Sequence, residues 1–401
     1  MRDIFLCDLN NFYASCEMAI DESIRDLPVA VSGRLEERKG VVIAKNYKAK
    51  EMGVDVGDLV FQALQKCPNL VVKPTNFELY NKYSKMVREI LLKYTDRVEP
   101  FSIDECFMDV TNSKIFGTPL EIANKIKEEV KEKLGITMSI GVSYNKTFAK
   151  IASEFKKPDA VSVVTKGDYK EKIWTLDISK MVGIGKRLEE KLKKYNINTI
   201  KDLANVDFDF ISRLLGKVGR DLKAYASGDD YREVDLYEHY IMPKSVGNST
   251  TFYRDLIKKE DIILGFTIIS ESVVNRMIKY NLQSARTMTV HAKDKDLNTF
   301  SKQVTFDYPT RSTNVITQKA VETFYKYFNL NSIRLLGIHL TNFSDSFIND
   351  NIFKTKGEKN DIDKAVLEIN QKLDKKAVFK LNNLLDDKIS SSFDRPPLQK
   401  K

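Results

Sequence analysis

The sequence predicts an α+β protein of several domains, in which two β-α-β-β-α-β units flank a short helical block. Three observations lead to this prediction. The chain has 401 residues, which is too long for a single hydrophobic core. Once residues 11–77 are set aside, apolar runs and helical periodicities up to residue 142 follow the order of a ferredoxin-like split unit. The same order recurs between residues 244 and 340.

The first unit begins with the run Ile4-Phe5-Leu6-Cys7-Asp8, which is typical of a strand buried on both faces and ends on an acid. Its other elements are a helix over 79–94, strands over 98–102 and 106–110, a helix that begins at Pro119, and a strand over 138–142. The inserted segment should begin with a helix over 11–17. It then carries short apolar runs at 29–31, 41–44 and 70–72, punctuated by Gly and Pro.

The second half begins with short helices over 167–231, interrupted by glycine turns at 182–186 and 215–219. A charged, extended linker is expected over 232–243. The second unit then reads as a strand over 244–250, a helix over 259–280, strands over 285–292 and 300–306, a helix over 314–328 and a strand over 333–340. A tail over 346–401 is expected to hold one more helix, over 362–373, before it frays.

Composition narrows the class of protein. Lys and Arg total 65 against 56 acids, a net charge of +9, which favours a polyanionic partner, although a Lys-rich proteome explains it equally well. No apolar run reaches 18 residues and the N-terminus lacks a signal-peptide layout, so we expect a cytoplasmic protein that spans no membrane. The four cysteines lack zinc spacing and read as free thiols. With only three His, a histidine metal site or Ser-His catalysis is unexpected.

Three acids are the candidate catalytic residues. Asp8 ends the first strand, while Asp104 and Glu105 form the corner between the second and third strands. First and third strands are neighbours in a split sheet, so the three carboxylates should lie close together and repel unless cations bind between them. Mg²⁺ suits such oxygen ligands, and two Mg²⁺ ions can drive an in-line phosphoryl displacement. The alternative is that these acids are ordinary turn and strand-end residues that bind no metal.

Several motifs narrow the chemistry. The string CDLNNFYASCE (7–17) resembles the opening motif of Y-family translesion DNA polymerases, and FSIDECF (101–107) resembles their second metal motif. GVSYNK (141–146), followed by FAKIAS (148–153) and KKP (156–158), resembles their third block. The resemblance extends to about residue 345. It implies a right-hand polymerase with a palm (1–10 and 78–166), fingers (11–77), a thumb (167–231), a linker (232–243), a little finger (244–345) and a tail (346–401).

The resemblance also implies roles for individual residues. Asp8, Asp104 and Glu105 would hold two Mg²⁺ ions, with a further oxygen from the Leu9 carbonyl. Tyr13 would act as a steric gate that rejects a ribose 2′-hydroxyl. The remaining implied nucleotide contacts are Asn11, Phe12, Tyr47, Lys50 and Lys157. Tyr47 and Lys50 lie three residues apart, so both can face one ligand from a helical turn.

Two departures leave the branch of the family open. Many members carry a second acid where this chain has Asn10, and an arginine where it has Lys50. Asn at position 10 resembles the pattern of the bacterial UmuC branch, whereas Tyr at position 47 resembles that of the bacterial DNA polymerase IV branch. The acid triad is intact in either case.

DNA contacts are expected in the second half. The turn Gly183-Ile184-Gly185 resembles a helix-hairpin-helix element, whose backbone N–H groups meet a DNA phosphate, and Lys186 follows it; a bare tight turn is the alternative. Residues 244–345 hold 14 Lys and Arg against 9 Asp and Glu, and this positive charge suits a domain that tracks along a DNA duplex. Lys244, at the start of this region, is the candidate contact.

The predicted reaction is addition of a deoxynucleotide to a primer 3′-hydroxyl with release of pyrophosphate, at low fidelity and without a proofreading exonuclease. The short fingers segment suggests that damaged templates are tolerated. Two alternatives remain: another palm-type enzyme such as a nucleotidyl cyclase, and a non-catalytic DNA-binding accessory protein of polymerase shape. Expected partners are primer-template DNA, deoxynucleoside triphosphates and the bacterial sliding clamp, with the protein a monomer. The clamp rests on the resemblance alone, because residues 390–398 match no convincing clamp peptide.

Overall fold

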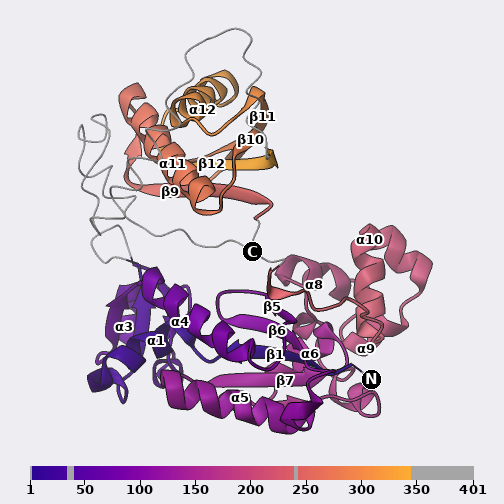
Figure 1. Cartoon of the computed structure of the whole chain (residues 1–401). Helices are drawn as coiled ribbons and strands as arrows, with labels where there is room; N and C mark the ends of the chain where they lie inside the picture. The colour runs from indigo at the N-terminus through magenta and orange to yellow at the C-terminus, as the bar shows by residue number, and fades with distance from the viewer. Residues whose placement is uncertain (1, 34–39, 239–242, 345–401) are drawn as a thin grey trace. The chain divides into compact units, whose positions relative to one another are not determined.

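The computed structural model describes residues 2–33, 40–238 and 243–344, and the chain divides near residue 240 into two compact units. Among the described residues, the first unit carries two sheets and the second unit carries one, and neither shares a core with the other (Figure 1). Within the described residues, no helix is both long enough and apolar enough to cross a bilayer. The predicted tail helix and any clamp-binding peptide lie outside these residues.

The first unit is built on a five-stranded sheet of order β5-β6-β1-β7-β8. Its strands are β1 (Ile4–Leu9), β5 (Val98–Pro100), β6 (Glu105–Asp109), β7 (Met138–Ser143) and β8 (Val161–Val163). β1 pairs antiparallel with β6 on one side and with β7 on the other, so the predicted first-to-third neighbour relation is confirmed. β8 pairs parallel with β7 and was not predicted, since three residues are too few to show a period.

The two faces of this sheet are both covered, and side-chain alternation along β1 divides its residues between them. Phe5 and Cys7 share a core with α4 (Phe77–Leu91) and α5 (Pro119–Leu134). Ile4 and Leu6 point the other way and pack with Ala149 of α6 (Lys146–Ser153). Burial on both faces explains why the first strand is a continuous apolar run.

Close approach of α6 to the sheet depends on Gly141 in β7. A Cβ placed at that position would lie 2.0 Å from the Ala149 carbonyl oxygen and 2.4 Å from the Ser153 nitrogen, so only glycine fits. α5 begins as predicted, with Pro119 in its first turn after a capping box between Thr118 and Glu121. The short 3-10 turn Lys114–Phe116 precedes it.

The inserted segment has two parts. α1 (Phe12–Ile20) buries Phe12, Ala14 and Cys16 in the same core as α4 and α5. The rest forms a three-stranded sheet of order β3-β2-β4 with a smaller core of its own. Its elements are the 3-10 turn Glu22–Ile24, β2 (Val29–Ser32), β3 (Val42–Lys45), α2 (Tyr47–Glu51), α3 (Val60–Lys66) and β4 (Val71–Pro74).

A helical block follows β8, and its core includes Phe148, Ile151 and Ala152 of α6. It contains α7 (Tyr169–Lys172), the 3-10 turn Ile178–Lys180, α8 (Lys186–Lys193), α9 (Ile200–Asn205) and α10 (Phe208–Ala226). The second predicted glycine turn is a kink inside α10, where Gly216 takes φ 62° and ψ −139°. That conformation lies in the positive-φ region, which favours glycine.

The described part of the predicted linker is extended and bound to the first unit. Val234 is fully buried among residues of β1, β6 and α6. Its carbonyl accepts a hydrogen bond from Arg97 at 3.1 Å, and the Asp235 N–H donates to Glu99 at 2.8 Å. Tyr237 donates its N–H to the Asp96 carbonyl at 3.2 Å. The segment is therefore held along the edge strand β5 by these hydrogen bonds.

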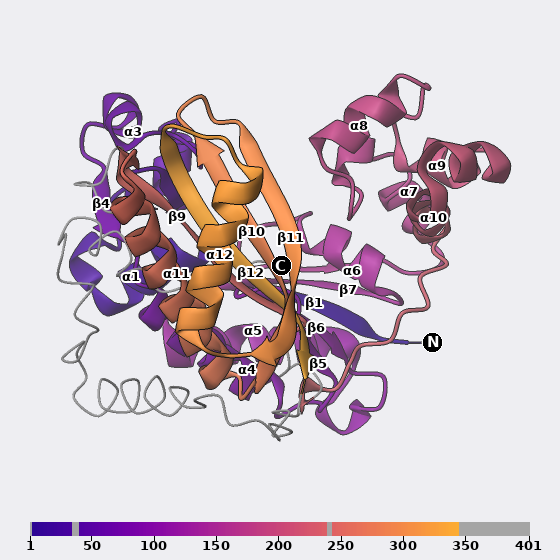
Figure 2. The same cartoon turned by 90° about the horizontal axis from the view of Figure 1, so that it is seen from above.

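The second unit has the predicted element order. It comprises β9 (Ser245–Leu256), α11 (Lys259–Lys279), β10 (Ser284–Asp294), β11 (Thr299–Thr310), α12 (Thr313–Tyr327) and β12 (Ile333–Ser344). Both helices cover one face of the sheet, as Figure 2 shows. The strand order is β11-β10-β12-β9, so the last strand separates β9 from β10. In the first unit the third strand takes that place, and the two sheets therefore differ in arrangement despite their shared element order.

Candidate active site

Two of the predicted acids face each other across neighbouring strands. Asp8 near the end of β1 is paired with Glu105, the first residue of β6. Both side chains lie on the face of the sheet that carries α6, because they keep the alternation of Leu6 and Phe107. Asp8 is 5% exposed. The backbone fixes the pairing further, since the Leu9 N–H donates to the Asp104 carbonyl at 3.0 Å.

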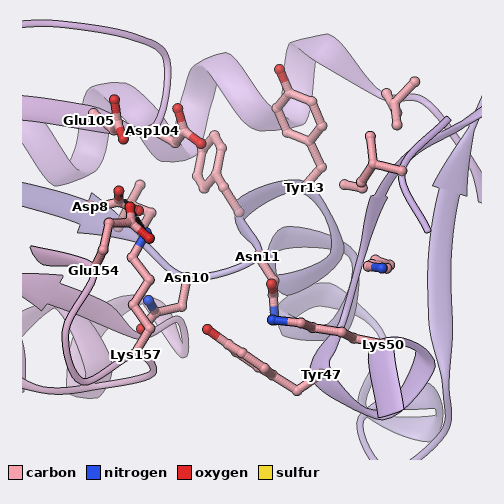
Figure 3. A pocket seen from close by; sticks show the side chains of 16 residues that line it. Asp8, Asn10, Asn11, Tyr13, Tyr47, Lys50, Asp104, Glu105, Glu154 and Lys157 are labelled. Atoms are coloured by element: carbon pink, nitrogen blue, oxygen red, sulfur yellow. Dashed lines mark hydrogen bonds and ion pairs between the residues drawn. The ribbon is translucent and has the colours of Figure 1, made fainter. Parts of the chain in front are cut away.

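The third predicted acid, Asp104, is the residue just before β6. Its carboxylate accepts a hydrogen bond from the Ser102 hydroxyl. Asp104 lines the same cavity as Asp8 and Glu105, and Figure 3 shows it beside Glu105. A metal cluster of all three acids stays a prediction.

The third carboxylate next to Asp8 and Glu105 belongs to Glu154, which the motif comparison did not single out. One oxygen from each of the three lies within 4.8 Å of the others. Glu154 is the residue after α6, and Lys150 is one helical turn before it. The sequence did contain one signal for these residues, a Lys–Glu pair spaced i, i+4 along a helix. The spacing alone did not show that this pair faces the acids of β1 and β6.

Two lysines neutralise these acids. Lys150 contacts Asp8 at 3.2 Å, Glu154 at 3.3 Å, and also Glu105. Lys157 contacts both Asp8 and Glu154 at 2.8 Å. Figure 3 shows Lys157 and Glu154 converging on Asp8. The predicted nucleotide contact Lys157 is therefore already engaged with the acids in this state of the protein.

The surroundings set different pKa values for the facing acids. Burial would raise the pKa of Asp8, but the hydrogen bond with Glu105 and the charges of Lys157 and Lys150 outweigh it and hold that pKa below its ordinary value. Burial and the hydrogen bond with Asp8 raise the pKa of Glu105 to about 7, against the opposing charge of Lys150. The pKa values of the two facing acids are therefore shifted in opposite directions.

The donor set fits divalent cations that prefer oxygen. The three grouped carboxylates span a distance close to the ~4 Å between opposite ligands of a Mg²⁺ octahedron. An ammonium group from Lys150 already lies among them, which shows that the position favours positive charge. Within the described part of the chain, no histidine or cysteine joins the group that would favour a softer metal.

One cavity gathers the predicted metal and nucleotide residues. Its volume is about 430 Å³, within the range of ligand sites. Asp8, Leu9, Asn11, Phe12, Tyr13, Tyr47, Lys50, Asp104, Glu105 and Lys157 all line it. Figure 3 shows Tyr47 and Lys50 across the cavity from the acids. The structure thus brings these residues together, while their individual roles stay predictions.

The aromatic wall of the cavity is firmly supported. Tyr13 stacks on Tyr80 and meets Phe77 edge to face, with ring centroids 5.9 Å apart. Phe12 is buried in the core beside it. Asn11, at the start of α1, takes the left-handed conformation (φ 46°), which Asn tolerates better than most residues. This turn directs Tyr13 toward the cavity.

The opposite wall is positioned by Asn46. Its side-chain oxygen accepts hydrogen bonds from the N–H groups of Ala49 and Val29, which caps α2 and ties it to β2. Tyr47 and Lys50 then project from α2, with the Lys50 ammonium 6.0 Å from the Tyr47 ring centre. The predicted helical turn is therefore confirmed.

Asn10 has a structural place next to the site. Its amide nitrogen donates to Ser139 at 3.0 Å, and its oxygen accepts from the Asp159 N–H at 2.9 Å. It is 2% exposed. An acid at this position could not donate to Ser139, so the amide suits the buried partners of this particular chain.

The predicted DNA contacts lie at separate positions. Gly183, with φ 89°, and Gly185 lead into α8, and Lys186 begins that helix with an exposed side chain. Lys244 is exposed just before β9. The turn and Lys244 belong to different units.

Comparisons with known proteins identify the family. Residues 7–154 match a model described as the impB/mucB/samB family, and residues 243–350 match the C-terminal domain of that family. Residues 166–197 match the HHH motif of the IMS family. The chain belongs to the impB/mucB/samB family.

Curated relatives carry a more specific name. The chain is 46% identical over 347 residues to the DNA polymerase IV of Acetivibrio thermocellus, covering 86% of this chain and 87% of that protein. It is 39% identical to DNA polymerase IV 1 of Bacillus subtilis, covering 84% and 81%.

Solved structures agree with this assignment. A Y-family DNA polymerase chimera of Dbh and Dpo4 matches with a TM-score of 0.76 and 26% identity, over 85% of this chain and 99% of that one. DinB from Sulfolobus solfataricus matches with a TM-score of 0.60 and 25% identity, with the same coverage. The predicted resemblance to Y-family DNA polymerases is confirmed.

Proposed function

We propose that this protein is a template-directed DNA polymerase of the DNA polymerase IV type, which adds deoxynucleotides to a primer 3′-hydroxyl during translesion synthesis. One observation carries the proposal: a single cavity is lined by the acids of β1 and β6, by an aromatic wall and by lysines suited to phosphates. A cyclase or a non-catalytic accessory protein would not require this combination together with the matched helix-hairpin-helix and C-terminal regions.

Each wall of the cavity has a task in this proposal. Asp8, Glu105 and Asp104, with the Leu9 carbonyl, would hold two Mg²⁺ ions. When bound, the ions supply activation of the attacking hydroxyl and stabilisation of the leaving pyrophosphate. Tyr47, Lys50 and Lys157 bind the triphosphate, with the lysines acting as point charges. Tyr13 excludes a ribose 2′-hydroxyl.

DNA is held outside the cavity. We propose that the backbone N–H groups of the turn at Gly183 and Gly185, with Lys186, meet one phosphate of the duplex. The regions named palm, fingers, thumb and little finger would follow the boundaries predicted from the sequence.

The second unit suits a duplex backbone as well. The face of its sheet opposite α11 and α12 carries mostly small polar side chains in cross-strand rows. One row has Ser249 and Ser301 at its ends with Gly337 and His291 between them. Another row is Ser245, Thr341, Thr287 and Thr305, of which Thr287 is buried. These described rows contain no carboxylate. Hydroxyl groups donate to phosphates without reading base sequence, so this face with Lys244 supports tracking along DNA.

The protein is proposed to work as a monomer that the bacterial sliding clamp recruits. Support for the clamp comes only from the family. A pull-down with purified clamp, comparing the full chain with a chain that ends at residue 345, tests it. Equal capture of both would place the contact outside the tail.

Primer extension tests the proposed function directly. With Mg²⁺, deoxynucleotides and an undamaged template, we expect extension. On a template with one abasic site, we expect synthesis past the lesion. Failure to extend the undamaged template would contradict the polymerase assignment. Normal extension that stops at the lesion would leave the polymerase intact and reject translesion synthesis.

A further inference from the structure

Lys150 is surrounded by three carboxylates. Its ammonium nitrogen lies 3.2 Å from Asp8 Oδ2 and 3.3 Å from Glu154 Oε1, and it also contacts Glu105 Oε1. A lysine ammonium has three N–H donors, so each donor has a carboxylate partner. The side chain is only 18% exposed, which strengthens these contacts relative to a surface ion pair.

The fold fixes this arrangement. Strand pairing sets Asp8 opposite Glu105. The missing side chain at Gly141 lets α6 approach β7 closely, and Lys150 projects from α6 over both acids. Backbone packing therefore places the base of the Lys150 side chain within reach of both acids.

Without a cation, the site would be unstable. Two facing buried carboxylates repel each other and lose hydration, and each charge must be paired to remain ionised. Lys150 supplies that pairing for Asp8 and Glu105 together. Lys157 adds a second positive charge, but it reaches only Asp8 and Glu154.

We propose that Lys150 is a built-in substitute for a divalent cation, which holds Asp8 and Glu105 in place while the site is empty and moves onto Glu154 when a metal ion binds. The inference rests on the proposed function. Lys150 is a positioning residue here, and Glu154 is the acceptor that both lysines already share.

The arrangement makes metal binding and nucleotide binding depend on each other. A metal ion entering alone must compete with Lys150 for Asp8 and Glu105, so its affinity is reduced. An incoming triphosphate attracts Lys157 away from Glu154. Glu154 then has only Lys150 to pair with, so it can accept Lys150 from the other two acids. The empty site stays preorganised, yet it retains metal strongly only when the nucleotide is present.

Mn²⁺ binding to the full chain, without DNA or nucleotide, tests this inference. Free Mn²⁺ is measured by electron paramagnetic resonance at pH 8. Lys150→Met removes the competing charge and keeps a side chain of similar length. We expect Mn²⁺ to bind about tenfold more tightly, because a neighbouring like charge commonly shifts a binding equilibrium by about the equivalent of one pKa unit. Lys156→Met makes the same charge change at an exposed position and should leave the affinity unaltered.

Glu154→Gln separates an acceptor from a metal ligand. As the acceptor, Glu154 matters only while Lys150 is present, so the substitution should weaken Mn²⁺ binding in the unaltered protein and have little effect beside Lys150→Met. An equal weakening in both backgrounds would make Glu154 a ligand and overturn its proposed role.

Urea unfolding provides a second readout. Metal-free Lys150→Met should unfold at a lower urea concentration than the metal-free unaltered protein. Added Mn²⁺ should raise the stability of Lys150→Met more than it raises that of the unaltered protein. If Lys150→Met does not fold, Lys150→Arg keeps the cation and should retain the weak Mn²⁺ binding of the unaltered protein, whereas tighter binding there contradicts the idea. Unchanged or weaker affinity in folded Lys150→Met overturns the inference. Failure of the unaltered protein to bind Mn²⁺ even with nucleotide and DNA would contradict the proposed function instead.

Discussion

The ring of Tyr13 lies flat against the ring of Tyr80, with centroids 4.4 Å apart and planes 16° from parallel. Tyr80 is fully buried, and its hydroxyl donates to Glu17 at 2.7 Å. A ring supported in this way cannot swing aside at low cost, because its neighbours fill the space behind it. The cavity therefore has a rigid wall where the sugar of a bound nucleotide would lie.

Shortening that wall should relax the choice of sugar. Tyr13→Ala is expected to raise incorporation of ribonucleotides relative to deoxynucleotides by about tenfold or more, since steric exclusion of a small group is worth about 1–3 kcal/mol. Single-nucleotide primer extension with matched ribo- and deoxynucleotides measures the ratio. Tyr13→Phe keeps the wall and serves as the control. A ratio that stays the same in Tyr13→Ala would show that another residue sets sugar choice.

Removing Asp104 should stop synthesis without releasing DNA. Asp104→Ala is expected to lower the incorporation rate by about a thousandfold or more, because a metal-binding carboxylate acts on the charge of the transition state. Fluorescence anisotropy with primer-template DNA should show nearly unaltered affinity. Retained synthesis in Asp104→Ala would contradict a metal-binding role for Asp104.

Gly141 should tolerate no side chain. In Gly141→Ala the new methyl group would overlap the backbone of α6, and we expect a loss of about 2–4 kcal/mol in the free energy of unfolding. Urea denaturation measures it. Gly33→Ala is the matched control, since nothing lies within 4 Å of a Cβ there. Equal stability of the two variants would show that α6 can move away from the sheet without cost.

Asp230 should contribute stability that depends on pH. Burial would raise its pKa, but hydrogen bonds from Arg232 and Thr147 outweigh burial and hold the pKa below the ordinary 3.8. As pH falls, the unfolded chain takes up this proton first, so unfolding becomes easier. The contribution is complete above the ordinary pKa and disappears as pH falls through the lower folded value.

The test compares Asp230→Asn with the unaltered protein. At pH 7 the variant should be less stable by about 2 kcal/mol, in line with loss of hydrogen bonds to a charged group. Between about pH 5 and pH 2 the difference should shrink, because the unaltered protein loses its advantage there. Urea unfolding at several pH values measures it. A constant difference across this range would contradict a role for the ionised carboxylate.

Much of the fold could be predicted because local patterns specified it. The apolar run of Ile4 to Asp8 indicated a strand buried on both faces, and Pro119 marked the start of α5. Strand arrangement in the second unit was not accessible in this way. The same element order permits either β11 or β12 to lie next to β9, and the choice depends on packing between distant residues.

The candidate site shows the same division. Strand adjacency in the split unit brought Asp8 to Glu105 correctly. The start of the third strand was less accessible: it was expected at residue 106, whereas β6 begins at Glu105 itself. Lys150 and Glu154 were missed because their direction is set by the contact between α6 and Gly141, which no short motif encodes.

Within the first unit, the helical block leaves the five-stranded sheet and rejoins it at neighbouring points. On the way out, Ser143 donates its hydroxyl to the Val164 carbonyl at 2.9 Å, and on the return Asn145 donates to the Gly228 carbonyl at 3.1 Å. Both joints therefore lie beside the short connection between β7 and α6. A segment whose two ends lie close together can be replaced or inserted with little disturbance of the rest of the fold. The helical block can therefore vary between relatives while the strands that carry the acids stay unaltered.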